Sequence, residues 1–318
     1  MHSLDKGYLS QLARETGFIR DTLEKVIRLA WILEFLNTEP AVANRLALKG
    51  GTAINMIFFP LPRLSVDIDL DYLGGEAREE MLQSRQVISA VIMRHMEEQG
   101  YHLKPRSKTP YSLDSWVFGY TNLAGNNDTI KIEINYSLRC HILAERPMPL
   151  ILPFLKESAP VRCLDVVEIY AGKINALLNR AAARDLFDVV NMINSDLMDE
   201  PRRPLLRKAV VFYAAISSKE TPSHLSLDAI DTITRQDIKT ALLPLLPRST
   251  HFDLEEAKRL SKAYLSELLQ LTASEAEFLT LFRRKRYEPA LLFDEPAIVR
   301  RIEAHPMALW KIAVGRRE

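Results

Sequence analysis

The feature that most constrains this 318-residue chain is the stretch of residues 48–73, in which a glycine pair is followed by a ladder of carboxylates. Residues 46–48 form a short apolar run of the kind that buried strands use, and residues 52–59 suit a helix. Gly50 and Gly51 therefore lie where a strand meets a helix N-terminus. Backbone N–H groups are unpaired at such a junction, and a residue without a Cβ lets a phosphate approach the main chain. The first half of the stretch predicts a phosphate-binding turn.

The second half of the stretch alternates aliphatic and acidic residues over positions 66–71. In a strand, this alternation turns the aliphatic side chains to the buried face and three carboxylates to the other face: Asp67, Asp69 and Asp71. Carboxylates this close repel one another unless a cation lies among them, and Mg²⁺ is the usual partner of clustered aspartates. The alternative is a strand with a solvated acidic face, which is awkward because aspartate is a poor strand former.

Together, the glycine turn and the acidic strand resemble the signature of the DNA polymerase β-like nucleotidyltransferase superfamily. The closer resemblance is to the AbiEii/AbiGii toxins, which include the MenT toxins. It rests on KGGTA at residues 49–53, on SVDIDL at residues 65–70 and on two later segments, and it spans most of the chain. It implies an α+β fold in which a small mixed nucleotidyltransferase sheet, flanked by helices, is followed by an all-α lobe.

The resemblance also implies the parts of an active site. Asp67 and Asp69 are expected to be catalytic and to hold Mg²⁺, with two ions activating an acceptor hydroxyl and stabilising the departing pyrophosphate. The turn and the residues near it are expected to bind a nucleoside triphosphate (NTP) substrate: Lys49, Gly50, Gly51, Thr52 and Ser65. Phosphorylation of Ser65 would add negative charge beside the carboxylates and silence the enzyme. The alternative is that Ser65 only ends a loop.

A third carboxylate comes from a later strand. Residues 130–134 alternate isoleucines with Lys131 and Glu133, which matches the geometry of the Asp67/Asp69 strand. Because superfamily sheets place a carboxylate on a neighbouring strand, Glu133 is the predicted third metal ligand. The alternative is an exposed glutamate that pairs with Lys131.

The chain is expected to divide into two domains. Prolines recur between residues 140 and 163 and exclude a long helix there, so we place the boundary near residue 155. Residues 1–155 would form the polymerase β-like nucleotidyltransferase domain with its N-terminal helices. Residues 156–318 would form a helical domain.

The helical domain is expected to contribute four residues to the cleft: Lys173, Arg180, Arg184 and Asp185. Asp165 is a predicted cap of a helix that reaches Arg180. At about 100° per residue, Arg180 lies within about 20° of Lys173 around the helix axis, and Arg184 does too if the helix continues. This basic stripe would bind the NTP phosphates, and the alternative is a solvated basic face.

Asp185 is predicted to be catalytic, either by orienting Lys173 or Arg184 or by acting as a base. The sequence does not decide between Asp185 and Asp188 for this role.

The remaining elements of the first domain are predicted from periodicity. Residues 4–37 form two amphipathic helices, residues 76–98 form a long helix, and short strands cover 101–104, 115–120 and 129–136. The first two helices also resemble a helix-turn-helix, which would make the protein a DNA-binding regulator. The second helix is too apolar to lie in a major groove, so packing on the sheet is the favoured interpretation.

Composition excludes little. Lys and Arg number 42 against 41 Asp and Glu, so any RNA contact must come from a local patch such as the basic run at 283–286, which precedes Tyr287. The two cysteines have no zinc-site spacing and are typical of reduced thiols. No apolar run approaches the roughly 20 residues that span a bilayer. We expect a soluble, cytoplasmic protein, a monomer rather than an oligomer, with no membrane partner.

By resemblance, the protein is a toxin of an AbiE-type toxin–antitoxin system with a role in phage defence. It is expected to transfer NMP from NTP to RNA, with a tRNA 3′ end as the predicted acceptor, and to inhibit growth or translation until a cognate antitoxin intervenes. Two alternatives stay open. One is a nucleotidyltransferase that modifies a protein hydroxyl, and the other is a non-catalytic nucleotide-binding or DNA-binding regulator.

Overall fold

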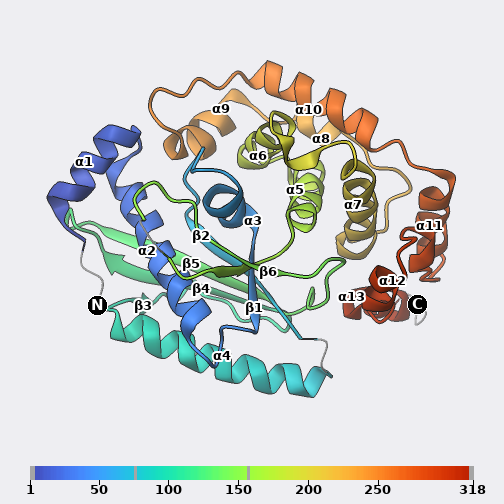
Figure 1. Cartoon of the computed structure of the whole chain (residues 1–318), viewed down its shortest axis with the longest axis horizontal. Helices are drawn as coiled ribbons and strands as arrows, with labels where there is room; N and C mark the ends of the chain where they lie inside the picture. The colour runs from blue at the N-terminus through green and yellow to red at the C-terminus, as the bar shows by residue number, and fades with distance from the viewer. Residues whose placement is uncertain (1–3, 75–76, 156–157, 315–318) are drawn as a thin grey trace. The chain divides into compact units, whose positions relative to one another are not determined.

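The computed structural model describes residues 4–74, 77–155 and 158–314. The chain forms two compact units, coloured by residue number in Figure 1. Unit 1 comprises Met1–Arg139, Glu145–Leu164 and Leu243–Thr250, and unit 2 comprises Cys140–Ala144, Asp165–Leu242 and His251–Glu318. Each unit therefore consists of three separate segments of the chain. The single boundary predicted near residue 155 falls inside unit 1.

Unit 1 is built on one mixed sheet. In the described part of the chain the sheet has seven strands in the order β3-β4-β5-β2-β1-β7-β6. Their bounds are β1 (Leu46–Lys49), β2 (Asp67–Tyr72), β3 (His102–Leu103), β4 (Leu113–Thr121), β5 (Asn127–Asn135), β6 (Arg146–Met148) and β7 (Val161–Cys163). The central strand β2 runs antiparallel to β1 and parallel to β5. The predicted mixed sheet is confirmed.

Two strands were not predicted. β6 and β7 lie in the proline-rich segment and pair with each other, and β7 also pairs with β1. Pro147 lies within β6, which is the last strand of the sheet, and an edge strand tolerates a proline because it need not donate every ladder hydrogen bond. Each strand has three residues, too few for alternation to reveal it in the sequence.

Helices flank this sheet. They are α1 (Lys6–Thr16), α2 (Arg20–Thr38), α3 (Gly50–Ala53), which continues into the π-type turn η1 (Ile54–Phe58), and α4 (Arg78–Glu98). Helix α1 packs against α2. Most apolar residues of α2 are buried, including Leu23, Val26 and Leu33, and α2 packs against β7. A helix buried in this way cannot enter a DNA groove, which removes the basis for the helix-turn-helix alternative.

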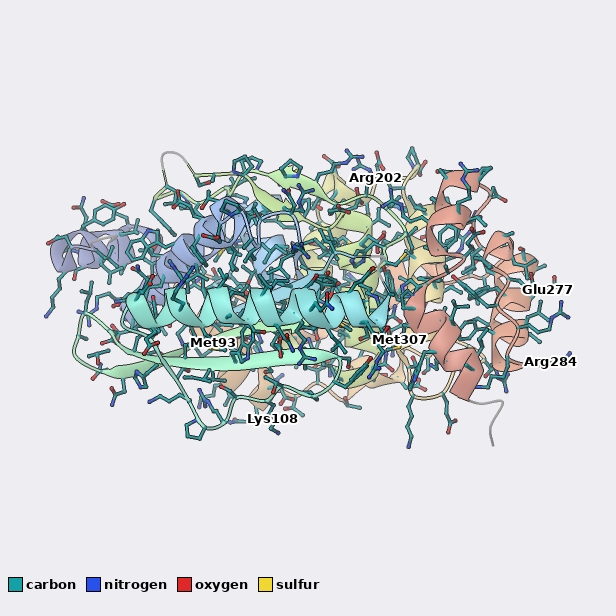
Figure 2. All side chains as sticks on the ribbon, turned by 90° about the horizontal axis from the view of Figure 1, so that it is seen from below. Met93, Lys108, Arg202, Glu277, Arg284 and Met307 are labelled. Carbon is teal, nitrogen blue, oxygen red and sulfur yellow. The ribbon has the colours of Figure 1, made fainter. Side chains whose placement is uncertain are left out.

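The long helix α4 runs alongside the sheet in both Figure 1 and Figure 2. Met81, Ile88, Ile92 and Met96 are buried, whereas Val87 is 51% exposed. The buried positions follow the spacing of one helix face, and Val87 stands one residue off that face. Glu76, the first residue of the predicted helix, lies outside the described residues.

The alternation predicted for the two central strands is present. Ile68 and Leu70 of β2 are buried, and the isoleucines of β5 are completely buried: Ile130, Ile132 and Ile134. The register places Asp67 opposite Lys131 and Asp69 opposite Glu133. Asp69 and Glu133 therefore emerge side by side on the same face of the sheet.

All regular elements in the described residues of unit 2 are helices, as the predicted all-α lobe requires. Its main helices are α5 (Val166–Arg180), α6 (Ala183–Ile193), α7 (Arg203–Ser217), α10 (Leu254–Leu268), α11 (Ala273–Arg283), α12 (Pro296–Ile302) and α13 (Pro306–Val314). Shorter pieces connect them: η2 (Asp196–Met198), α8 (Asp228–Asp231), α9 (Arg235–Asp237), η3 (Ile238–Leu242) and η5 (Pro289–Leu291). The central helix α5 packs against α6 and α7.

Across residues 4–74, 77–155 and 158–314, no helix has the length and apolar character that a membrane span requires.

Candidate active site

The glycine turn and the acidic strand meet in unit 1. Gly50 has a φ of 68°, a left-handed conformation that residues with a side chain rarely adopt. A Cβ at Gly50 would lie only 2.6 Å from Oδ2 of Asp69, so the missing side chain is what lets the carboxylate lie against the turn. The structure therefore brings together the two halves of the stretch that the sequence singled out.

Thr52 ties the same turn to the start of β2. Its side chain is completely buried, and its hydroxyl shares hydrogen bonds with Oγ of Ser65, at 2.9 Å, and with the carbonyl oxygen of Asp67. The amide of Asn55 also donates to the carbonyl oxygen of Gly51, at 2.8 Å. These bonds hold the turn and the carboxylate strand as one rigid piece.

Ser65 lies in the loop just before β2, which begins at Asp67. The side chain is 6% exposed and bonded to Thr52. Because β2 begins only at Asp67, Ser65 precedes the strand that carries the carboxylates, and its predicted role in NTP binding stays a prediction. A modifying enzyme would reach the buried hydroxyl only after the loop opens locally. A glutamate at this position would also bury a charge, so Ser65→Ala is the cleaner substitution for probing the hydroxyl.

Lys49 pairs with the last carboxylate of the ladder. Its ammonium lies 2.5 Å from Oδ1 of Asp71, which is almost completely buried. Burial raises the pKa of Asp71, and the nearby ammonium of Lys49 only partly offsets this effect. In this arrangement Lys49 neutralises Asp71, while its predicted role in NTP binding stays a prediction.

Two of the three carboxylates predicted to bind Mg²⁺ are placed to do so, and the third is paired with a lysine. Asp67 and Asp69 are half-buried and share one face of β2, which supplies two oxygen ligands of the kind that Mg²⁺ prefers. Glu133 stands opposite Asp69 but is held by Lys131, whose Nζ lies 2.8 Å from its carboxylate. Within the described residues, no group of three or more His, Cys, Asp or Glu side chains is already placed to hold a metal ion. Asp67 and Asp69 fit the ion, and Glu133 can join them only by releasing Lys131.

Arg63 is a residue that sequence reasoning missed. Its side chain is 2% exposed, its Nη1 donates to the carbonyl oxygen of Leu64 at 3.0 Å, and a Cβ at Gly51 would lie 2.6 Å from its Nη2. A buried guanidinium therefore touches the turn expected to bind phosphates. The available signal was a single cation within the apolar loop before Ser65.

A second cluster lies wholly within unit 2. Asp165 caps α5, as predicted, by accepting from the backbone N–H of Val167. Nζ of Lys173, on α5, lies 2.8 Å from Asp185 and 3.0 Å from Asp188, both on α6. All three side chains are buried. The ammonium of Lys173 thus pairs with both carboxylates, so either Asp185 or Asp188 is placed to orient it.

Arg180 completes the cluster from the solvent side. Its Nε donates to Oδ2 of Asp185 at 2.7 Å, and its side chain is 66% exposed. Burial alone would raise the pKa of Asp185, but the Lys173 ammonium and the Arg180 guanidinium outweigh it and hold that pKa below its ordinary value. Lys173 and Arg180 thus share one carboxylate, which supports their predicted position on one face of α5.

The predicted stripe does not extend to Arg184. The helix ends at Arg180, because Ala181 adopts a left-handed conformation with φ 49°, and α6 starts at Ala183. The condition on which Arg184 shared the face of Lys173 is therefore not met. Its predicted role in NTP binding remains untested.

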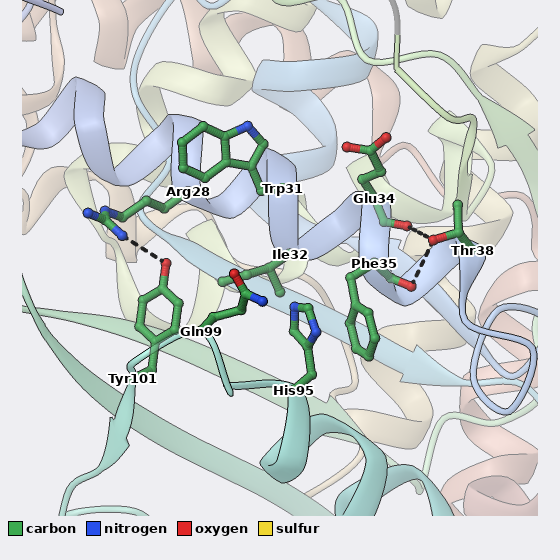
Figure 3. Close-up of a pocket in the computed structure, with 9 residues that line it drawn as sticks. All are labelled: Arg28, Trp31, Ile32, Glu34, Phe35, Thr38, His95, Gln99 and Tyr101. Atoms are coloured by element: carbon green, nitrogen blue, oxygen red, sulfur yellow. Dashed lines mark hydrogen bonds between the residues drawn. The ribbon is translucent and has the colours of Figure 1, made fainter. Parts of the chain in front are cut away.

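One cavity of unit 1 lies apart from these residues. It has a volume of about 320 Å³ and is lined by α2, the end of α4 and the segment that follows (Figure 3). The rings of Phe35 and His95 stack there at 3.5 Å, and Arg28 donates to the hydroxyl of Tyr101. None of its lining residues belongs to the predicted site.

Comparison with known proteins decides the family. Residues 32–284 match the family described as the nucleotidyl transferase AbiEii toxin of type IV toxin–antitoxin systems. The chain belongs to the AbiEii family. It is therefore a nucleotidyltransferase of a type IV toxin–antitoxin system, as the signature in β1, β2 and the turn predicted. No curated protein matches the AbiEii chain in sequence.

The fold of this AbiEii protein also occurs in a solved structure. It is similar to MenT4, a nucleotidyltransferase toxin from Mycobacterium tuberculosis H37Rv, with a TM-score of 0.63 and 17% sequence identity. The similarity covers 96% of this chain and 99% of MenT4. At this identity the likeness shows a common fold.

Gly50→Ala tests the contact between the turn and Asp69. Gly125→Ala is a matched control, because Gly125 also has a positive φ of 87° but no atom lies within 4 Å of a Cβ added there. We expect the control to lose about 1 to 2 kcal/mol of stability from backbone strain alone. Gly50→Ala should lose more and should also lose nucleotide transfer, since its Cβ displaces the carboxylate. Urea unfolding and a transfer assay measure both, and equal behaviour of the two variants would contradict the geometry.

The lowered pKa of Asp185 predicts a pH dependence of stability. A carboxyl group with a depressed pKa in the folded state stabilises the fold above its unfolded pKa, and this contribution is lost as the pH falls through the folded value. At neutral pH we expect Asp185→Asn to be less stable than the wild type by about 3 kcal/mol, because Lys173 loses a buried partner. The difference should shrink once the pH falls below the ordinary value of 3.8. A difference that stays constant down to the acid unfolding of the wild type would refute this assignment.

Proposed function

We propose that this AbiEii nucleotidyltransferase transfers NMP from an NTP to a hydroxyl of RNA, with a tRNA 3′ end as the acceptor. The observation that carries the proposal is the contact between the Gly50 turn and the Asp69 carboxylate in a chain of this family. A glycine turn that leads into a helix, beside two oxygen ligands, supports binding of an NTP with its cation.

The reaction is a substitution at phosphorus. The acceptor hydroxyl oxygen forms a bond to the α-phosphorus, the bond from that phosphorus to the β-phosphate oxygen breaks, and pyrophosphate leaves with the bonding electron pair. The hydroxyl proton passes to water or to a carboxylate. In this family, catalysis of such a step consists mainly of positioning and of stabilising negative charge, and both fall to the residues of the turn and of β2.

The residues of unit 1 divide this work in our proposal. The backbone N–H groups at Gly50 and Gly51 receive the β- and γ-phosphates, and Thr52 keeps the turn fixed against β2. Arg63, buried beside Gly51, supports the turn with a fixed positive charge. Asp67 and Asp69 would hold Mg²⁺, which supplies charge neutralisation and an acidified hydroxyl when bound. Glu133 is an additional ligand if Lys131 releases it.

The residues of unit 2 carry positive charge to the phosphates in our proposal. Lys173 neutralises charge that develops in the transition state, and Arg180, whose guanidinium is exposed, grips the bound NTP. Asp185 holds both cations. A carboxyl group whose pKa is lowered in this way is a weak base, so we assign Asp185 to orienting Lys173 instead of to proton abstraction.

The biological setting follows from the family. A toxin of a type IV system has a cognate antitoxin, and we propose that uncontrolled transfer to tRNA stops translation and growth until the antitoxin intervenes. Phage defence and a cytoplasmic location belong to the same proposal.

The test is incubation of the protein with labelled NTPs, cellular RNA and cellular protein. We expect the label to appear in RNA of tRNA size and to depend on Mg²⁺. Asp69→Asn should lower the rate at least about a hundredfold and leave the melting temperature unchanged or higher, because it removes one of several repelling charges. Asp294→Asn, the same change at an exposed position, is the control and should retain full activity. Label in the protein fraction would show that the acceptor is a protein hydroxyl and not RNA. Label in neither fraction would refute the proposal.

A further inference from the structure

A second cavity of unit 1 carries three arginines. Its volume is about 500 Å³, and the arginines are Arg14 near the end of α1, Arg20 at the start of α2, and Arg248. Phe18, which is 5% exposed, and Ser10 also line it. None of these residues belongs to the predicted active site. No local pattern predicts the cavity, because Arg248 is more than two hundred residues from the others.

The backbone builds this cavity in a defined way. Gly17 ends α1 with a φ of 75°, which turns the chain sharply into α2. The carbonyl oxygen of Gly17 accepts from the backbone N–H of Arg248 at 3.0 Å. This bond holds the returning segment Leu243–Thr250 against the α1–α2 turn and places Arg248 beside Arg14.

The charges of the cavity are not balanced. Arg20 donates to Oδ1 of Asp21 from Nε and Nη2, at 3.1 and 3.0 Å, so it already has a carboxylate partner. Arg14 and Arg248 are exposed, and neither forms an ion pair with any residue that the structure describes. Like charges gathered around one cavity lower stability unless an anion joins them. Guanidinium groups bind phosphate oxygens in a bidentate fashion, so phosphate is the anion that this arrangement favours.

The segment Leu243–Thr250 contacts both the cavity and the chain just before the candidate active site. The backbone N–H of Leu64 donates to the carbonyl oxygen of Leu245 at 2.8 Å, three residues before Arg248, and Leu64 stands three residues before Asp67. With 3.8 Å between consecutive Cα atoms, the Cα of Arg248 is at most about 30 Å from that of Asp67. An RNA strand that presents its 3′ end at Asp67 and Asp69 is long enough to reach the cavity with an upstream phosphate.

We propose that the cavity of Arg14, Arg20 and Arg248 binds a backbone phosphate of the acceptor RNA, several nucleotides from the end that is modified. This inference rests on the proposed function, because it takes RNA as the acceptor. Such a contact is independent of base sequence and fixes the register of the RNA strand on the enzyme. It adds affinity for RNA without touching the NTP.

The experiment measures RNA binding directly, with end-labelled total tRNA as the probe at several salt concentrations. The variant is Arg14→Glu/Arg248→Glu. Arg94→Glu/Arg106→Glu, which makes the same charge change at exposed residues of unit 1, is the matched control. The variant should bind RNA at least about tenfold more weakly than the control, and the slope of log affinity against log salt should fall by about 1 to 2. Affinity for the Mg²⁺ complex of NTP should be equal in both, and the melting temperature should not fall.

Two results would overturn the inference. One is RNA binding by Arg14→Glu/Arg248→Glu that equals binding by the control. The other is a loss of NTP binding with RNA binding intact, which would make the cavity a nucleotide site. The proposed function is tested independently by the labelling experiment, and it fails if the wild type transfers label to protein or to neither fraction. Cavity-dependent RNA binding in that case still supports the phosphate site.

Discussion

The contact between the Gly50 backbone and the Asp69 carboxylate is the constraint on which the rest of unit 1 depends. It requires a glycine with φ 68°, a strand β2 whose odd residues face the turn, and a loop that returns the chain to begin β2 at Asp67. Thr52 secures this arrangement by bonding the turn to the backbone of Asp67. The sheet supports it from the other side, because Ile68 and Leu70 fill the core while Asp67 and Asp69 remain half-buried on the opposite face. The alternation of aliphatic and acidic residues in β2 therefore contributes both to the core and to the candidate site.

Each unit contains a buried carboxyl group paired with basic side chains. The pKa values of these two carboxyl groups shift in opposite directions. Asp71 is paired with the ammonium of Lys49, and burial leaves its pKa raised. Asp185 is also buried, but it faces Lys173 and Arg180 together, and its pKa is lowered. The balance between burial and nearby cations thus shifts the two pKa values in opposite directions. A lowered pKa favours the charged form of Asp185, which strengthens its ion pairs with Lys173 and Arg180.

Local patterns in the sequence predicted the elements that rest on periodicity or on a motif. The alternation of β2 and β5, the buried face of α2 and the Asp165 cap all follow from rules that act over a few residues. What escaped prediction depends on distant parts of the chain or on rare backbone conformations. Ala181 breaks the helix in a left-handed conformation that alanine rarely adopts, so the separation of Arg184 from the stripe had no local signal. Arg63 and the Leu243–Thr250 segment acquire their positions only through tertiary packing.

Cation binding tests the central claim most directly, because it does not depend on which acceptor the enzyme uses. Mn²⁺ replaces Mg²⁺ at oxygen sites and is observed by paramagnetic resonance, so its binding can be titrated in the presence of a non-reactive NTP analogue. Wild-type protein should bind Mn²⁺ with the analogue, Asp67→Asn and Asp69→Asn should each lose that binding, and Glu133→Gln should weaken it less. Equal Mn²⁺ affinity in the wild type and in both aspartate variants would contradict the account.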